Sequence, residues 1–216
     1  GSYGNVLVFM DDDVTVAPGS IRTLAEACMS HPMSIVVGNI SSLGPSGSIF
    51  SQIMSNRQLV DTRGGSDLEE LPFVDCNTQL LCVQRSDFFR LAMFQDPAGG
   101  WPNWDDVDFG YRAHLEGYQV LRSKGALAKH WDYALSDLVT CSNRWYRASK
   151  SAVRLFQKHP GLRAFIPMFR DKGPFAWHSD RPALIVRKGL RASTATWKVI
   201  ASDLPLGLIV PDGTAQ

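Results

Sequence analysis

The residues with the clearest chemical potential lie near the start of the chain, where Asp11, Asp12 and Asp13 directly follow a short apolar run. In an extended backbone, residues i and i+2 point to the same side, so Asp11 and Asp13 would face together and Asp12 would face away. Adjacent carboxylates repel one another, and a divalent cation is the natural counter-charge because Mg²⁺ and Mn²⁺ accept oxygen ligands. The cluster therefore predicts a Mg²⁺ or Mn²⁺ site, although a solvated acidic turn would have the same sequence.

A second acidic group, Asp105, Asp106 and Asp108, opens a predicted helix that ends near Glu116. Free N–H groups and the helix dipole favour an acid at this end, so Asp105 can be explained as a cap. One cap is enough, which makes Asp106 the candidate for a general base that accepts a proton from an alcohol. Asp108 and Arg112 are spaced i, i+4, which predicts an ion pair on the helix face worth only about 0.3–0.5 kcal/mol.

His130 lies at the end of the last predicted strand and is the histidine best placed for a metal site. A single histidine is more often structural than a ligand. Here two carboxylate groups are already available, and mixed Asp and His sites bind manganese well. The remaining histidines lie at predicted helix ends, on a helix or in basic loops, and we expect structural roles for them: His31, His114, His159 and His178.

Short apolar and periodic segments must position these residues. Residues 5–10 and 34–40 are predicted to be buried strands of a parallel sheet, and Ser20 is the expected N-cap of a helix between them. This order argues for an α/β layer structure. Further elements are expected as follows: strands within 73–84, at 118–122 and at 126–131, and a helix over 137–158 with Trp145, Ala148, Ala152 and Phe156 on one stripe.

The charge is distributed unevenly along the 216 residues, although the net charge is only +1. Residues 1–140 hold 9 Lys and Arg against 17 Asp and Glu, whereas residues 141–198 hold 13 against 2. The basic stretch is either a solvated helical face or a surface for anionic lipid headgroups or a phosphorylated acceptor. It has no zinc-finger spacing, basic zipper or aromatic ribonucleoprotein signature, so nucleic acid is not an expected partner.

The remaining composition describes an ordinary globular chain, with 44% apolar residues and four cysteines that form no C-x-x-C pair. No apolar run reaches 18 residues and no secretory signal is visible. We therefore expect a reduced compartment and a cytoplasmic location, with peripheral attachment to the inner face of the plasma membrane through residues 141–198.

In their order and spacing, these residues resemble family-2 glycosyltransferases of the GT-A fold. The resemblance covers about residues 5–160, and its Trp-Asp-Asp form is similar in particular to bacterial galactofuranosyltransferases. It implies an α/β fold with a Rossmann-like, mixed but mostly parallel sheet flanked by helices. Residues 1–140 would be the C-terminal part of the catalytic domain, and 141–216 a basic helical extension. The matching segments are Val8–Val14, Asn77–Arg85, Trp104–Arg112, Gly117 and His130.

The resemblance also implies an inverting, metal-dependent enzyme of cell-envelope or polysaccharide glycan synthesis. It would move a sugar from a nucleotide-diphosphate donor, in the first place a UDP-sugar, to a hydroxyl of a glycan or lipid-linked acceptor. Asp11 and Asp13 would hold the metal, and His130 would complete the coordination or touch the diphosphate. Asp12 or Asp11 would lie near the ribose. Asp106 would be the general base, and Asp105 would help to position the acceptor.

Two further residues are candidates for binding the donor, and the start of the chain departs from the family. Trp101, in a Gly-Gly-Trp loop, would stack on the apolar face of the sugar, although a plain surface loop has the same composition. Arg144 belongs to what remains of the Gln-x-x-Arg-Trp motif of processive relatives. The glutamine of that motif is replaced by Cys141, which disfavours a processive synthase. Only ten residues precede Asp11, where relatives carry base-binding strands, so the sequence predicts a chain truncated at its N-terminus.

Two other classes remain open. Residues 9–16 also fit the D-x-D-x-T pattern of haloacid-dehalogenase-like phosphatases, with Asp11 as nucleophile and Asp13 as acid and base. That class needs a later acidic pair after an apolar strand, whereas Asp105 and Asp106 follow Pro-Asn-Trp. The third class is a non-catalytic sugar-nucleotide-fold binding module. An EF-hand is excluded because the glycine and glutamate of its loop are missing.

Overall fold

The computed structural model describes residues 4–43, 67–95, 104–166, 175–178 and 180–202. The chain divides into two compact units, Gly1–Pro160 and Gly161–Gln216. All of the candidate catalytic, metal-binding and donor-binding residues that the structure describes lie in the first unit. Trp101 lies outside the described residues.

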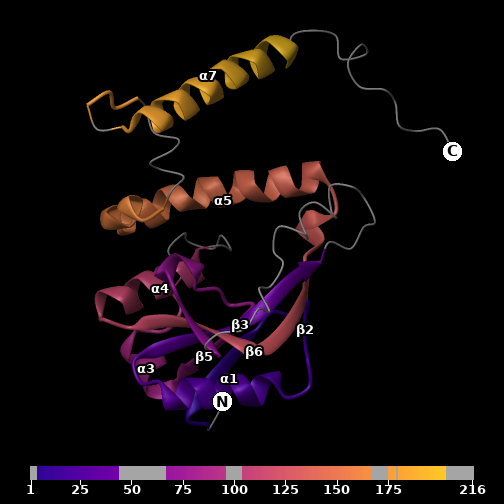
Figure 1. Ribbon diagram of the computed structural model, residues 1–216, viewed down its shortest axis with the longest axis vertical. Coiled ribbons are helices and arrows are strands. Elements are labelled where there is room, and N and C mark those ends of the chain that lie inside the picture. Colours follow the sequence, from indigo (N-terminus) through magenta and orange to yellow (C-terminus); the bar gives the residue numbers. More distant parts are fainter. Residues whose placement is uncertain (1–3, 44–66, 96–103, 167–174, 179, 203–216) are drawn as a thin grey trace, which may run out of the picture. The chain divides into compact units, whose positions relative to one another are not determined.

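The first unit is built on a mixed six-stranded sheet (Figure 1). Among the described strands, only β3 and β6 pair in parallel, and the other pairs are antiparallel. The expectation of a mixed sheet is therefore confirmed, but the expectation that it is mostly parallel is wrong. β5 lies between β1 and β3 and runs opposite to both, so it separates two strands that a strand–helix–strand pattern would place side by side. In spatial order the strands are β1 (Val6–Met10), β5 (Leu80–Gln84), β3 (Ser34–Leu43), β6 (Gln119–Trp131) and β2 (Val14–Val16), and β4 (Leu68–Leu71) also pairs with β6.

Strands β1, β3 and β6 nevertheless run in the same direction. β5 is antiparallel to both β1 and β3, so these two strands run the same way, and β6 is parallel to β3. Their carboxyl ends therefore meet at one edge of the sheet. In open α/β sheets, ligands bind outside this edge. Asp11 follows β1, Ser42 lies near the end of β3, and His130 lies near the end of β6, so the topology gathers residues from three strands there.

Strand β6 is continuous over a region where the sequence predicted two short strands. The break between the two predicted strands is a β-bulge in β6. Gly38 of β3 pairs with Ser123, whereas the next residue of β3, Asn39, pairs with Leu127. A bulge inserts extra residues into one strand and increases its local twist. Gly38 is needed opposite it, because a Cβ there would lie 2.5 Å from the Leu80 side chain.

Helix α1 (Ser20–Ser30) packs on one side of the sheet, and α4 (Asp105–Leu115) and α5 (Leu138–Lys158) lie on the other side (Figure 1). Leu24 and Cys28 of α1 are fully buried. The expectation that Ser20 caps α1 is wrong: Gly19 is the N-cap, with φ 86°, and Ser20 Oγ donates to the Leu127 carbonyl at 2.8 Å. Glycine adopts this left-handed backbone without a steric penalty, and no side chain caps this helix start.

The remaining described elements of the first unit are helices. Helix α5 is capped by Asp137, whose Oδ1 accepts from Thr140 N at 2.8 Å. Its stripe is buried at Ala148, Ala152 and Phe156 as predicted, but Trp145 lies at the edge of the stripe and is 58% exposed. Besides α1, the helices described in the first unit before its boundary are η1 (Phe73–Asp75), α3 (Arg85–Arg90), α4 (Asp105–Leu115), η2 (Tyr133–Leu135) and α5 (Leu138–Lys158).

The second unit contains α7 (Pro182–Ser202), and η3 (Pro160–Ala164) lies at the boundary between the two units. Near the start of α7, Lys188 Nζ pairs with Asp180 Oδ2 at 2.6 Å, and both side chains are buried. None of the helices that the structure describes is both long enough and apolar enough to cross a bilayer.

Candidate functional site

Asp11, Asp13 and His130 converge at the carboxyl edge of the sheet. Their ligand atoms all lie within 4.8 Å of one another, and His130 Nε2 is 3.1 Å from Asp13 Oδ1. The β2–β6 ladder produces this approach, because it pairs Val14 with His130 and lets Trp131 N donate to the Asp13 carbonyl at 2.9 Å. The neighbouring Asp12 is exposed.

The three side chains fit a divalent cation. Adjacent ligands of an octahedral ion with bonds of about 2.1 Å lie about 3 Å apart, which is close to the Asp13–His130 separation. Partial burial, and then the Asp13 carboxylate, raise the pKa of Asp11 above its usual value. A bound cation would remove this repulsion. Two carboxylates and one imidazole suit Mn²⁺ or Mg²⁺.

The far side of the His130 ring is held by residues that the sequence analysis missed. His130 is only 3% exposed, Gln79 Nε2 lies 2.9 Å from its Nδ1, and Ser42 Oγ lies 3.5 Å from the same nitrogen. The Gln79 carbonyl also accepts from Asp11 N at 3.3 Å. Gln79 stands directly before β5, and no spacing in the sequence relates it to a histidine so far along the chain.

Asp105 and Asp106 lie in the first turn of α4, whose N-cap is Trp104 with φ 84°. The cap predicted for Asp105 is therefore wrong, and neither acid is used as the N-cap. Asp106 is half-buried, and its Oδ1 accepts from Val107 N at 2.7 Å. Burial, and then the Asp105 carboxylate, raise the pKa of Asp106 to about 7, with a smaller contribution from Asp11. The two acidic groups of the sequence thus influence each other electrostatically.

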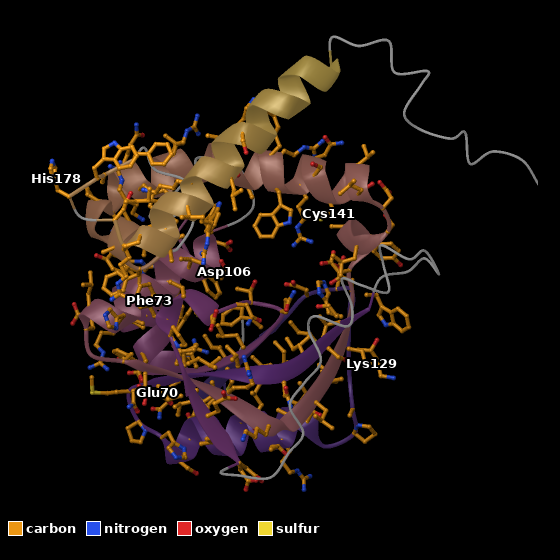
Figure 2. All side chains as sticks on the ribbon, turned by 45° about the horizontal axis from the view of Figure 1, so that its top comes forward. Glu70, Phe73, Asp106, Lys129, Cys141 and His178 are labelled. Carbon is orange, nitrogen blue, oxygen red and sulfur yellow. The ribbon has the colours of Figure 1, made fainter. Side chains whose placement is uncertain are left out.

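Close packing fixes the start of α4, where Figure 2 labels Asp106. A Cβ at Gly110 would lie 2.6 Å from the Phe73 carbonyl and 2.7 Å from Cys76 Cβ, so the helix rests directly on the backbone of η1 and the residue after it. Trp104 Nε1 donates to the Ala148 carbonyl of α5 at 2.7 Å. These two contacts hold Asp106 between the sheet edge and α5.

Asp108 forms the ion pair predicted with Arg112, at 2.8 Å, but not on an exposed helix face. The Asp108 side chain is fully buried because the end of α5 covers it. Lys158 Nζ and His159 Nε2 lie 2.8 Å and 2.7 Å from its Oδ1. Burial alone would raise the pKa of Asp108, but hydrogen bonds from Lys158, Arg112 and His159 hold it below its usual value. Asp108 therefore positions α4 and has no access to a substrate.

An open cleft of about 460 Å³ adjoins the acidic group, and its walls include two aromatic side chains. Trp131 is 43% exposed and Tyr133 is 66% exposed, so both can stack on a sugar ring or a base. Asp132, between these two aromatic residues in the sequence, pairs with Arg144, whose Nη1 lies 2.8 Å from Asp132 Oδ1. The residues that line the cleft are Asp12, Asp13, Thr15, Trp131 and Tyr133.

Comparisons with known proteins add little to this description. No family model matches the sequence, and no curated protein matches it. Among solved structures, a crystal structure of GalNAc-T7 with UDP, GalNAc and Mn²⁺ is similar, with a TM-score of 0.45 and 13% identity. The similarity covers 60% of this chain and 28% of that chain, so this chain spans less than a third of the length of GalNAc-T7 in that structure. We therefore base the function on the side chains of this chain alone.

Proposed function

We propose that this chain carries the metal and acid–base centre of an inverting, metal-dependent glycosyltransferase with a GT-A-like fold. The observation that carries the proposal is the meeting of Asp11 and Asp13 with His130, far apart in sequence, at the carboxyl edge of β1 and β6. The distances that support it join Asp13 to His130 and place Asp11 within reach of both. Asp106, with its raised pKa, lies in the field of Asp11.

In this proposal Asp11, Asp13 and His130 Nε2 hold Mg²⁺ or Mn²⁺, which when bound would neutralise the negative charge of the leaving diphosphate. Asp106 accepts the proton of the acceptor hydroxyl. The acceptor oxygen then forms a bond to the anomeric carbon while the bond from that carbon to the diphosphate oxygen breaks on the opposite face, so the configuration inverts. A base with a pKa of about 7 matches general-base catalysis near neutral pH. Asp105 is proposed to orient the acceptor.

The donor is proposed to be a UDP-sugar, with Asp12 or Asp11 near the ribose. The acceptor is proposed to be a glycan or a lipid-linked glycan of cell-envelope or polysaccharide synthesis. The cleft beside Asp13 offers Trp131 and Tyr133 as stacking surfaces for these ligands. Arg144 is paired with Asp132 and is proposed to contribute its positive charge to the diphosphate. Trp101 remains a proposed sugar contact.

A phosphatase that uses Asp11 and Asp13 is the second candidate. It requires a further acidic pair after an apolar strand. Asp105 and Asp106 instead lie in the first turn of α4, directly after Trp104 in the sequence, and this position favours the transferase.

The test is transfer from a panel of radiolabelled UDP-sugars in the presence of Mn²⁺, with release of UDP as the readout. Asp106→Asn should lower kcat by at least about 100-fold and leave the Kd for UDP within about twofold. Equal loss of turnover and UDP binding would contradict the role of Asp106 as the base. Hydrolysis of para-nitrophenyl phosphate would favour the phosphatase, and UDP binding without any turnover would favour a binding module.

We also propose that the outward side of α5 binds an anionic membrane surface, on the inner face of the plasma membrane. Tyr146 is 61% exposed and Val153 is 55% exposed, beside the exposed cations Arg147 and Lys150. Lys150 Nζ lies 4.5 Å from the centre of the Tyr146 ring. The helix sequence contains no acidic residue. A basic amphipathic surface of this kind is attracted to anionic headgroups while its apolar side chains enter the interface.

A further inference from the structure

Gln79 is the nearest polar neighbour of His130 on the side away from the acids, with its amide nitrogen 2.9 Å from His130 Nδ1. We infer that Gln79 is a positioning residue that sets the tautomer of His130 and thereby controls how well the site binds its divalent cation. This inference rests on the metal site of the proposed function. Gln79 touches neither substrate nor cation in it and acts only through His130.

The contacts of His130 define one state of the ring. When Gln79 presents Nε2 to Nδ1, 2.9 Å away, a hydrogen bond requires Nδ1 to accept, so the proton of a neutral ring then sits on Nε2. Nε2 then donates to Asp13 Oδ1, 3.1 Å away. In this state the lone pair needed for a cation is absent from Nε2, and Asp13 and His130 satisfy each other.

The cation-binding state needs the other tautomer. Nε2 must offer its lone pair, so the proton must sit on Nδ1 and requires an acceptor there. Gln79 carries both an N–H donor and a carbonyl acceptor on the same carboxamide, and a half-turn of this group presents Oε1 to Nδ1 in place of Nε2. Ser42 Oγ, at 3.5 Å, is the more distant alternative. A glutamine therefore serves both tautomers, whereas a side chain that only donates would serve one.

The backbone keeps the amide at this position in both states. The Gln79 carbonyl accepts from Asp11 N, and the next residue, Leu80, is fully buried at the start of β5. The backbone of Gln79 is thus held at Asp11, directly after β1, and its side chain contacts His130 on β6. Groups that orient a metal-bound histidine typically change metal affinity by 10–100-fold when they are replaced.

The experiment measures Mn²⁺ binding to the purified chain by electron paramagnetic resonance of the free ion, with no donor present. Gln79→Met keeps the size of the side chain but removes both polar atoms, and it should raise the Kd by about 10–100-fold. Gln79→Glu supplies a permanent acceptor and should bind Mn²⁺ at least as tightly as the wild type. The matched control is Gln84→Met at the other end of β5, where the amide donates to the Cys28 carbonyl at 3.4 Å, and its Kd should not change.

A second readout reports the tautomer directly. The ¹⁵N shifts of the His130 ring should place the proton on Nε2 without metal and on Nδ1 with saturating Mg²⁺. A wild-type Kd retained in Gln79→Met, or a proton on Nδ1 in the metal-free wild type, would overturn the inference and leave the metal site intact. A wild type that binds Mn²⁺ no better than Asp13→Ala would instead overturn the metal site itself, and the inference with it.

Discussion

Asp108 Oδ1 and Lys158 Nζ lie 2.8 Å apart at a place where the Asp108 side chain has no exposed surface, and this contact ties the first turn of α4 to the last residue of α5. Arg112 extends the tie, because its guanidinium also donates to the carbonyls of Leu91 and Met93 after α3. The helix that presents Asp106 is thus fixed to α5 by the Asp108 carboxylate and to the segment after α3 by Arg112.

We expect Asp108→Asn to destabilise the first unit by about 3–5 kcal/mol, because it leaves buried cationic groups without their counter-charge. The measurement is the free energy of unfolding in urea at pH 7. The control is Glu69→Gln, which removes the exposed pair between Glu69 and Arg122 and should cost less than about 1 kcal/mol. Similar losses in the two variants would contradict the importance of burial.

The same carboxylate predicts a pH dependence of stability. Because the pKa of Asp108 is lowered in the folded state, its contribution is complete above the ordinary carboxyl pKa and is lost as the pH falls through the folded value. The difference in unfolding free energy between the wild type and Asp108→Asn should therefore shrink in acid. A difference that stays constant down to the lowest pH at which the protein folds would count against this linkage.

Gly110→Ala should displace the start of α4 and destabilise the unit by about 1–3 kcal/mol, since the new Cβ would meet the Phe73 carbonyl and Cys76 Cβ. Transfer activity should fall together with stability, because Asp106 moves with the helix. Thermal unfolding and an activity assay provide the two measurements. Gly189→Ala in α7 is the control: no atom lies within 4 Å of its Cβ, so the helix should gain stability.

Asp106→Asn should make the protein more stable at alkaline pH while it removes activity. The raised pKa means that the folded state binds the proton more tightly than the unfolded state, so wild-type stability falls as the pH rises from about 4 to about 7. Asparagine does not titrate, and the variant should gain up to about 4 kcal/mol over the wild type at pH 8 and little at pH 4. In the wild type, kcat/KM should rise to a plateau above about pH 7. Equal melting temperatures of the two proteins at pH 8 would argue against a buried, ionised Asp106.

Mn²⁺ should stabilise the wild type by about 2.7 kcal/mol at a free concentration 100 times its Kd, because the ion binds the folded site only. The measurement is thermal unfolding with Mn²⁺ and after chelation. Asp13→Ala should abolish the stabilisation. Asp12→Ala, which removes the exposed neighbouring carboxylate, should retain it, and equal loss in both variants would indicate general attraction of cations to acidic residues.

Reversal of two charges on α5, Arg147→Glu with Lys150→Glu, should lower binding to phosphatidylserine vesicles by at least about 100-fold, at about 1 kcal/mol for each charge removed and further loss from repulsion. Co-sedimentation at two salt concentrations measures this, and binding of the wild type should weaken with salt. Arg22→Glu with Lys129→Glu reverses two exposed charges elsewhere and is the control. Equal binding to neutral phosphatidylcholine vesicles would contradict the proposal.

Local patterns in the sequence predicted much of the candidate site. The apolar run before Asp11, the acids at the start of α4 and the strand before His130 were all found from spacing over a few residues. Helix and strand periodicity depend on residues that are close in the sequence, so they predict local structure without knowledge of the tertiary contacts. The helices α4 and α5 accordingly begin and end within about a residue of their predicted limits.

The sequence by itself determined which segments carry the acids and the histidine. Only the tertiary structure decided that β5 separates β1 from β3, that Asp108 is covered by the end of α5, and that Gln79 meets His130. These contacts join residues that lie far apart in the chain. Their formation depends on which strands pair and which faces pack, and no local spacing encodes that choice.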